Sequence, residues 1–333
     1  MISERLLGYY DFSPDVIAAV SDTASWQDKQ SFESLTSKYK VESGPTEVCP
    51  PGSKKPLEVL RFLPDVDYDE HALDIYHLPM ANNISPNMVM RGIRLFGSNP
   101  TTPLLMVGNP GSPGSPTGKL TWAEMFQVFR NKDLGPINRG LLQLLEAQGV
   151  DKTRHLGYSY GADKAVAATR LSPEYGQTVT NGVLVEPAAV IKRNFAKLAM
   201  DFNKSGLLLE DYWQQTDSQA YQAIRQSENY IGLARYVLGL GRLSNLVIEN
   251  TLIGDGFRQG LQDAIVAQPD IGLAIAWGAE SEICDDDSML SITKDPRLST
   301  RAKFKSMRLE GMHHAGGEDI DLHAAIMLEG LRV

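Results

Sequence analysis

The stretch around Ser159 is the part of the sequence best suited to covalent chemistry. Ser159 is the central residue of the only G-x-S-x-G in the chain, between Gly157 and Gly161. Residues 153–158 are predicted to form a short buried strand, and residues 161–170 the first turns of a helix. Because neither glycine has a Cβ, the chain has room for a very tight bend at the serine. A strand–turn–helix bend of this kind pushes the serine Oγ out at the carboxyl edge of a sheet, which is the geometry of a nucleophile elbow.

A serine hydroxyl is a poor nucleophile, so a base and an orienting carboxylate must accompany it. His313 and His314 follow the predicted last strand, residues 302–309, and several acidic residues follow the strand before it, residues 271–277. The order serine, acid, histidine along the chain is that of the α/β-hydrolases. From about residue 55 to residue 333 the chain resembles this family, and the resemblance implies its fold and a Ser-His-acid triad.

The resemblance selects one of the two adjacent histidines as the base. In the family a glycine stands three residues before the catalytic histidine, and the residue directly before that histidine is usually small. Gly311 has this position relative to His314, which is therefore the expected base. His313 remains the alternative, one residue out of register.

The acid is expected after the seventh strand of the family's sheet. The commonest family pattern has an aspartate three residues after the glycine that closes this strand, but here that glycine is Gly278 and the third residue is Ser281. A variant of the pattern has the acid one residue later, which makes Glu282 the first choice. Asp285 and Glu280 remain alternatives.

Two backbone N–H groups are needed to stabilise a tetrahedral oxyanion. The first is expected from Tyr160, directly after the serine, where the N-terminus of the helix adds a favourable dipole. The second follows the third strand. If that strand is the one that begins at His71, Pro79 cannot donate because it has no N–H, and the donor is Met80, with Leu78 as the alternative.

A rival third strand is residues 103–107, which end in a glycine-rich turn. If this strand is the third, Gly111 or Ser112 is the expected donor. The turn also resembles the one that follows the fourth strand of the family.

These side chains require a scaffold that brings the ends of strands together. Short apolar segments alternate with amphipathic ones along the chain, which predicts a mostly parallel, twisted sheet flanked by helices on both faces. The α/β-hydrolase fold has this architecture. The predicted strands are 56–63, 71–78, 103–107, 153–158, 182–185, 271–277 and 302–309. The predicted helices are 12–24, 87–96, 121–129, 136–148, 161–170 and 322–332, and residues 31–43 are expected to form an edge strand before a loop at 44–55.

Residues 190–268 interrupt the alternation. They contain consecutive helical patterns without a convincing strand, and the segment is longer than one crossover requires. In the family an insertion at this place forms a helical cap. The expected division is therefore an α/β-hydrolase core of residues 1–189 and 269–333 and a cap or lid of residues 190–268.

The composition is that of an ordinary globular protein: of 333 residues, 42% are hydrophobic and 22% are charged. A net charge of -9 argues against nucleic acid or an anionic membrane as a partner, because both attract basic surfaces. No apolar run approaches the length of a membrane span, and the N-terminus has no signal-peptide pattern, so a cytoplasmic protein is expected. Cys49 and Cys284 are isolated in sequence, and neither a disulfide framework nor a C-x-x-C motif is predicted.

The sequence therefore predicts a serine hydrolase that acts by acyl transfer to Ser159 and needs no cofactor or metal. A small or medium, partly apolar carboxylic ester is the expected substrate, since the predicted cap contains leucine, tyrosine, methionine and tryptophan side chains. Hydrolysis of thioesters, amides or carbon–carbon bonds by the same triad is an alternative. A non-catalytic binding or scaffold protein of the same fold is another, favoured by the unusual acid loop and by Pro79. A homodimer is compatible with the sequence.

Overall fold

A computed structural model describes residues 10–27, 30, 32–38, 46–50, 56–79, 84, 86–109, 117–194, 196–198, 200–201, 204–205, 250–252 and 254–333. Within these residues the strands form one eight-stranded sheet with the order β1-β2-β4-β3-β5-β6-β7-β8. The strands are β1 (Thr46–Val48), β2 (Leu57–Phe62), β3 (Ala72–His77), β4 (Leu104–Val107), β5 (Lys152–Tyr158), β6 (Thr178–Val185), β7 (Gly272–Gly278) and β8 (Phe304–Leu309).

The sheet is mostly parallel, as predicted. Only the pairs β1–β2 and β2–β4 are antiparallel, and all other neighbouring strands run in the same direction. β3 lies between β4 and β5, so the strand at residues 72–77 is the third strand of this topology and the strand at 104–107 is the fourth. β5 lies between β3 and β6, and the carboxyl ends of these parallel strands therefore meet around Tyr158.

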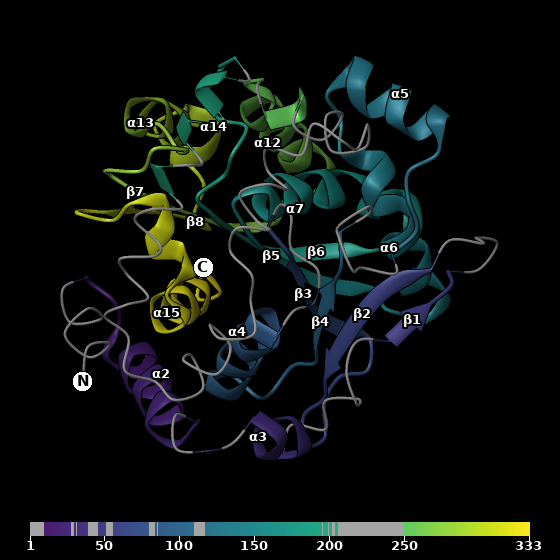
Figure 1. The fold of residues 1–333 in the computed structure, drawn as a ribbon, viewed down its shortest axis with the longest axis vertical. Coiled ribbons are helices and arrows are strands. Elements are labelled where there is room, and N and C mark those ends of the chain that lie inside the picture. The colour runs from purple at the N-terminus through teal and green to yellow at the C-terminus, as the bar shows by residue number, and fades with distance from the viewer. Residues whose placement is uncertain are drawn as a thin grey trace.

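Helices cover both faces of the sheet (Figure 1). Their bounds are α2 (Pro14–Gln27), α3 (Phe32–Lys38), α4 (Pro86–Ser98), α5 (Trp122–Asn131), α6 (Gly135–Ala147), α7 (Tyr160–Leu171), α12 (Gly256–Ala267), α13 (Asp286–Thr293), α14 (Pro296–Ser299) and α15 (Ile320–Gly330), with short 3-10 helices η1 (Ser172–Tyr175) and η2 (His314–Glu318). α2, α4 and α15 pack together on one face. α6, α7 and α12 pack on the other face, so the helix that follows Ser159 belongs to this second layer.

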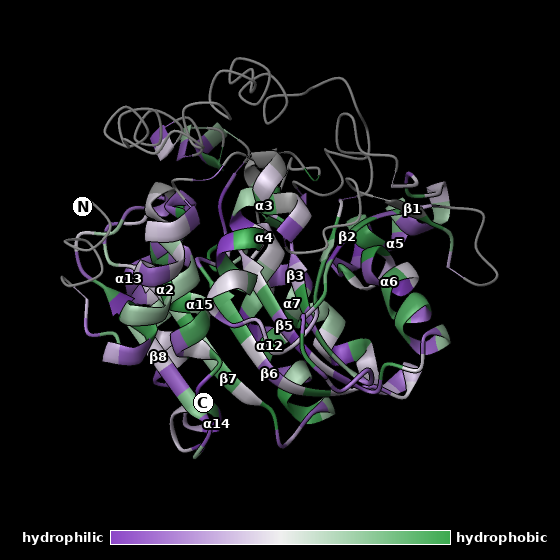
Figure 2. Cartoon of the chain, turned by 90° about the horizontal axis from the view of Figure 1, so that it is seen from below, coloured by the Kyte–Doolittle hydropathy of each residue, from purple (hydrophilic) through white to green (hydrophobic). Residues whose placement is uncertain are grey.

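The central strands are apolar because both faces of the sheet are covered. Every residue of β4 and β7 is buried. α15 is also apolar along most of its length, and Figure 2 shows hydrophobic residues along this helix. Since α15 packs against α2 and α4, the C-terminal helix closes that side of the core. Nowhere in the described ranges is there a helix with the length and hydrophobicity needed to cross a membrane.

The edge strand predicted at residues 31–43 is wrong, because α3 occupies residues 32–38. Leu35 is buried in the cluster formed by α2, α4 and α15. Phe32 and Leu35 are three residues apart, which fits a helical turn, and the loose alternation of this segment was too short to define a period of two. The edge strand is instead β1, inside the predicted loop, where it pairs antiparallel with β2.

The last helix of the predicted cap belongs to the core layer. α12 packs on α7, and its buried residues Phe257, Leu261 and Ala264 join the same cluster as Val166 of α7. α12 then leads directly into β7, as a crossover helix does. Residues 206–249 lie outside the described residues, so the cap itself stays a prediction.

Candidate active site

The turn between β5 and α7 is a tight, strained bend. Ser159 has φ 55° and ψ −129°, and a positive φ is uncommon for a residue with a side chain. A Cβ on Gly157 would lie 2.3 Å from the carbonyl oxygen of Gly161, and a Cβ on Gly161 would lie 2.0 Å from the carbonyl oxygen of His77. The Ser159 N–H donates to the Val185 carbonyl oxygen at 2.8 Å, which ties the bend to β6. The strand, the turn and the helix predicted around the serine are all present.

His314 lies beside Ser159. Its Nε2 is 3.1 Å from Ser159 Oγ, and the two residues are only 5% and 3% exposed. Tyr158 helps to position the histidine, because its ring stacks on the imidazole with 5.2 Å between the ring centroids. The Tyr158 hydroxyl also donates to the His314 carbonyl oxygen at 2.7 Å. The residue before the serine thus holds the histidine that faces the serine.

The carboxylate on the other ring nitrogen of His314 belongs to Glu186. His314 Nδ1 is 2.9 Å from Glu186 Oε2. Because a carboxylate oxygen accepts, Nδ1 carries the proton and Nε2 directs its lone pair at the serine hydroxyl. Ser159, His314 and Glu186 therefore form one hydrogen-bonded chain, which is the arrangement in which a histidine can remove the proton of a serine.

Glu186 is placed by the strand that it follows. It is fully buried at the end of β6, and its own φ of 51° turns the chain there. Its carboxylate accepts a short hydrogen bond from the Gly278 N–H and another, of 2.5 Å, from the Ser281 hydroxyl. Ser281 stands where the commonest family pattern has its aspartate. In this chain the serine at that position orients an acid that comes from the neighbouring strand.

The acidic residues that follow β7 lie elsewhere, and the choice of Glu282 as partner of His314 is wrong. Glu282 Oε1 instead lies 2.9 Å from His313 Nδ1 and 3.3 Å from Lys204 Nζ. Glu280 Oε2 lies 3.5 Å from His313 Nε2. Asp285 caps the N-terminus of α13. A second histidine–carboxylate pair, His313 and Glu282, is therefore adjacent to the first.

Glu186 and Ser281 are site residues that the sequence did not predict. The available signal was a glutamate directly after a buried strand, at the edge of the sheet where parallel strands present their functional groups. The family pattern directed attention to the next strand instead.

The expected oxyanion donors are the backbone N–H groups that border the elbow. Tyr160 is the first residue of α7, so its N–H lies at a helix N-terminus directly after Ser159. Leu78 is buried immediately after β3, the strand that neighbours β5. Met80, Gly111 and Ser112 lie outside the described residues. The order of the strands favours the segment after β3 over the segment after β4 as the source of the second donor.

A buried carboxylate on α7 supports the loop that carries Glu186. Asp163 accepts hydrogen bonds from the N–H groups of Ala188 at 2.9 Å and Ala189 at 3.3 Å. Burial raises the pKa of Asp163 to about 7, although these two hydrogen bonds act in the opposite direction. α7 thus holds both the serine at its N-terminus and the loop after β6.

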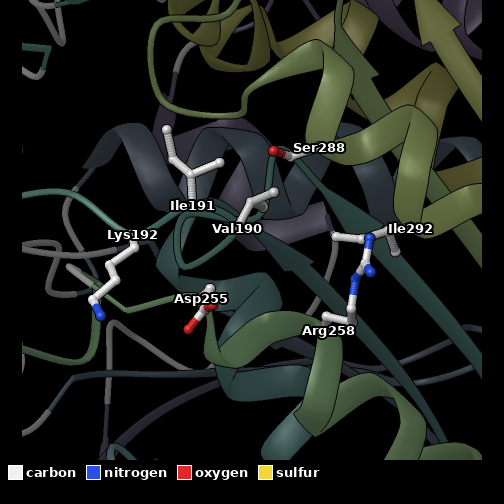
Figure 3. A pocket seen from close by; sticks show the side chains of 7 residues that line it. All are labelled: Val190, Ile191, Lys192, Asp255, Arg258, Ser288 and Ile292. Atoms are coloured by element: carbon white, nitrogen blue, oxygen red, sulfur yellow. The ribbon is translucent and has the colours of Figure 1, made fainter.

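A pocket of about 280 Å³ lies between the loop after β6, the start of α12 and α13 (Figure 3). Its lining mixes apolar, basic and acidic side chains. The lining residues are Val190, Ile191, Lys192, Asp255, Arg258, Ser288 and Ile292. Ser159, His314 and Glu186 are not among them, so this pocket is separate from the hydrogen-bonded chain at the elbow.

No protein-family model matches the sequence, and no curated protein matches it. Solved structures are similar to it in fold. The bromoperoxidase from Bacillus anthracis gives a TM-score of 0.54 at 12% identity, over 86% of this chain and 100% of that chain. Naproxen esterase (carboxylesterase NP) from Bacillus subtilis gives 0.53 at 13% identity, over 97% and 100%. The 2-hydroxy-6-oxo-6-phenylhexa-2,4-dienoate hydrolase from Rhodococcus sp. strain RHA1 gives 0.51 at 13% identity, over 88% and 100%. At these identities the likeness is one of fold: this chain has the α/β-hydrolase fold, as the resemblance of its sequence implied.

Proposed function

We propose that the protein is a serine hydrolase that cleaves carboxylic esters through an acyl-enzyme on Ser159. The observation that carries the proposal is the hydrogen-bonded chain from Ser159 through His314 to Glu186, with distances of 3.1 and 2.9 Å. Both distances are within the reach that proton transfer and ring orientation require. In this proposal Glu186 keeps the productive tautomer of His314 and stabilises the imidazolium that forms during the reaction.

The first half-reaction transfers the acyl group. His314 Nε2 takes the hydroxyl proton of Ser159 as Oγ bonds to the carbonyl carbon, and the carbonyl π electrons move to oxygen. The N–H of Tyr160 stabilises this oxyanion, and for the second donor we propose Met80, with Leu78 as the alternative. When the intermediate collapses, the bond to the alcohol oxygen breaks, and that oxygen takes the proton from His314.

The second half-reaction releases the acid. Water takes the place of the alcohol, gives a proton to His314 Nε2 and attacks the acyl carbon. Collapse of the second intermediate breaks the bond to Ser159 Oγ, which recovers its proton. The carboxylic acid then leaves, and the enzyme returns to its starting state without any other reactant.

The substrate that we propose is a small or medium, partly apolar ester. Two proteins named as esterases share the fold, naproxen esterase at a TM-score of 0.53 and a Pyrococcus furiosus esterase at 0.52, which supports this choice. The fold is also that of the 2-hydroxy-6-oxo-6-phenylhexa-2,4-dienoate hydrolase, so hydrolysis of a carbon–carbon bond is the alternative. Turnover of p-nitrophenyl esters with acyl chains of increasing length measures the preference directly.

A fluorophosphonate probe tests the proposal, because it labels only an activated serine. We expect wild-type protein to be labelled at Ser159, as located by mass spectrometry, and Ser159→Ala to stay unlabelled. Ester turnover by Ser159→Ala should fall on the order of a million-fold, with an unchanged melting temperature. Hydrolysis by this variant within about tenfold of wild type would contradict the assignment. Folded wild type that is neither labelled nor active would favour a non-catalytic role.

A further inference from the structure

Lys164 on α7 is buried, which is unusual for a lysine. Its side chain is 2% exposed, and its Nζ donates a hydrogen bond to Asn109 Oδ1 at 2.5 Å. Burial lowers the pKa of this amine to about 7. Burying an amine costs free energy unless it is hydrogen-bonded, and Asn109 supplies such a bond.

Asn109 links Lys164 to the segment after β3. It is also 2% exposed, and its Nδ2 donates to the Pro79 carbonyl oxygen at 2.6 Å and to the Leu78 carbonyl oxygen at 3.4 Å. The two carbonyl oxygens and Lys164 together determine which way round the amide lies. A reversed amide would direct its NH2 at the amine and its oxygen at two carbonyl oxygens. The amide is therefore held in one orientation, with its donor on Pro79.

The backbone at the end of β3 lies close to the elbow. The end of β3 touches α7 so closely that a Cβ on Gly161 would lie 2.0 Å from the His77 carbonyl oxygen and 3.1 Å from the Leu78 carbonyl oxygen. Asn109 therefore anchors two consecutive carbonyl groups, those of Leu78 and Pro79, directly after β3 and close to the elbow.

We propose that Asn109, oriented by Lys164, is a positioning residue for the oxyanion segment of the active site. The inference rests on the proposed function, in which this segment supplies the second donor. Asn109 acts through the carbonyls of Leu78 and Pro79 and does not touch the substrate. A misdirected donor weakens binding of the oxyanion more than binding of the ground-state carbonyl, so kcat falls while KM changes little.

Asn109→Asp tests this role with almost no change in shape. The aspartate keeps an oxygen for Lys164 but has no hydrogen to donate to the Pro79 carbonyl. We expect kcat for a p-nitrophenyl ester to fall about 10- to 100-fold, less than the roughly 100- to 1,000-fold lost with an oxyanion donor itself. KM should stay within about threefold. Labelling by the fluorophosphonate should slow by a similar factor to kcat, because its phosphoryl oxygen takes the place of the oxyanion.

Asn138→Asp is the matched control. Asn138 on α6 is 1% exposed, and its Nδ2 donates to the carbonyl oxygens of Leu134 at 3.3 Å and Lys164 at 3.1 Å. The same substitution thus removes the same kind of hydrogen bond, here to backbone carbonyls of α6 and α7, and leaves the bonds to Leu78 and Pro79 in place. We expect a lower melting temperature but wild-type kcat and wild-type labelling.

Lys164→Met removes the bond that orients Asn109 and serves as the second variant if Asn109→Asp does not fold. Its kcat should fall about three- to tenfold, since Asn109 keeps its NH2 on the two carbonyl oxygens but loses the bond that holds the other end of its amide. Wild-type kcat in folded Asn109→Asp would overturn the inference. If Asn109→Asp does not fold, wild-type kcat in Lys164→Met would overturn it. So would an equal loss of kcat in Asn138→Asp. Wild type without labelling or activity would refute the proposed function, and the inference with it.

Discussion

Replacing Glu186 with glutamine distinguishes the acid seen in the structure from the one expected from sequence. The Glu186 carboxylate accepts hydrogen bonds from three donors: His314 Nδ1–H, the Gly278 N–H and the Ser281 hydroxyl. Glutamine offers one oxygen and one NH2 to the same three partners. The Gly278 N–H can only donate, so the glutamine oxygen has to face it. The NH2 then faces His314 and Ser281.

This arrangement reverses the tautomer of His314. The Ser281 hydroxyl can rotate and accept, but an Nδ1–H cannot face an NH2, so the imidazole proton moves to Nε2. Nε2 then has no lone pair with which to take the proton of Ser159. In a serine triad the wrong tautomer costs about 10⁴-fold in kcat, which is about 5.5 kcal/mol in the free energy of activation. We expect Glu186→Gln to lose about this factor.

The assay is hydrolysis of p-nitrophenyl butyrate, with the melting temperature of each variant as a check of folding. Glu282→Gln is the matched control, because Glu282 makes the equivalent 2.9 Å contact with Nδ1 of the adjacent His313. Its kcat should stay within about threefold of wild type. The reasoning is refuted if folded Glu186→Gln keeps kcat within about tenfold of wild type, or if Glu282→Gln shows the large loss instead.

Three further predictions concern residues around the serine. His314→Ala should lose ester turnover about as completely as Ser159→Ala, while His313→Ala keeps most of it; the opposite ranking in kcat would show that the register is off by one. Tyr158→Phe keeps the ring stack but leaves the His314 carbonyl without its donor, so urea titration should show a loss of about 1–3 kcal/mol in the free energy of unfolding, and no loss would count against this bond. The third concerns Lys164, whose pKa is about 7 in the folded protein and 10.5 in the unfolded chain. Between these two pH values the unfolded state binds more protons than the folded state, so the free energy of unfolding of wild type rises with pH. Between about pH 7 and 9.5 the free energy of unfolding of wild type should gain about 3 kcal/mol over that of Lys164→Met, and parallel pH profiles would contradict this.

The elbow was predictable because its geometry depends mainly on near neighbours in sequence. A residue with a Cβ at Gly157 would collide with the backbone of Gly161, and the strand and helix patterns on either side of the turn are also local. The alternation of such patterns was enough to predict a mostly parallel sheet covered on both faces. The edge strand predicted at residues 31–43 is wrong because a loose alternation over so short a segment does not define a period, and α3 forms there instead.

The two adjacent histidines show where local sequence becomes insufficient. A turn pattern favoured His314 over His313, and in the structure His314 faces Ser159 while His313 faces Glu282. The direction of each ring is set by what surrounds it, such as the Tyr158 ring under His314. The sequence favoured His314 as the base, and the packing around each ring decides that His314 contacts Ser159 and Glu186 while His313 contacts Glu282.

Sequence alone determined the strained serine turn, the fold class and the short set of histidines that follow the last strand. Tertiary structure decided which carboxylate meets His314. A sequence pattern can show that an acidic residue follows a strand. It cannot show which strand lies beside β5 or how the chain turns at the end of that neighbouring strand. β6 lies next to β5, and the positive φ of Glu186 turns the chain where its carboxylate meets His314, 128 residues away in sequence. The buried bonds from Lys164 to Asn109 and on to Pro79 depend in the same way on three segments that meet only in the folded chain, because buried polar groups bond to whatever folding brings beside them.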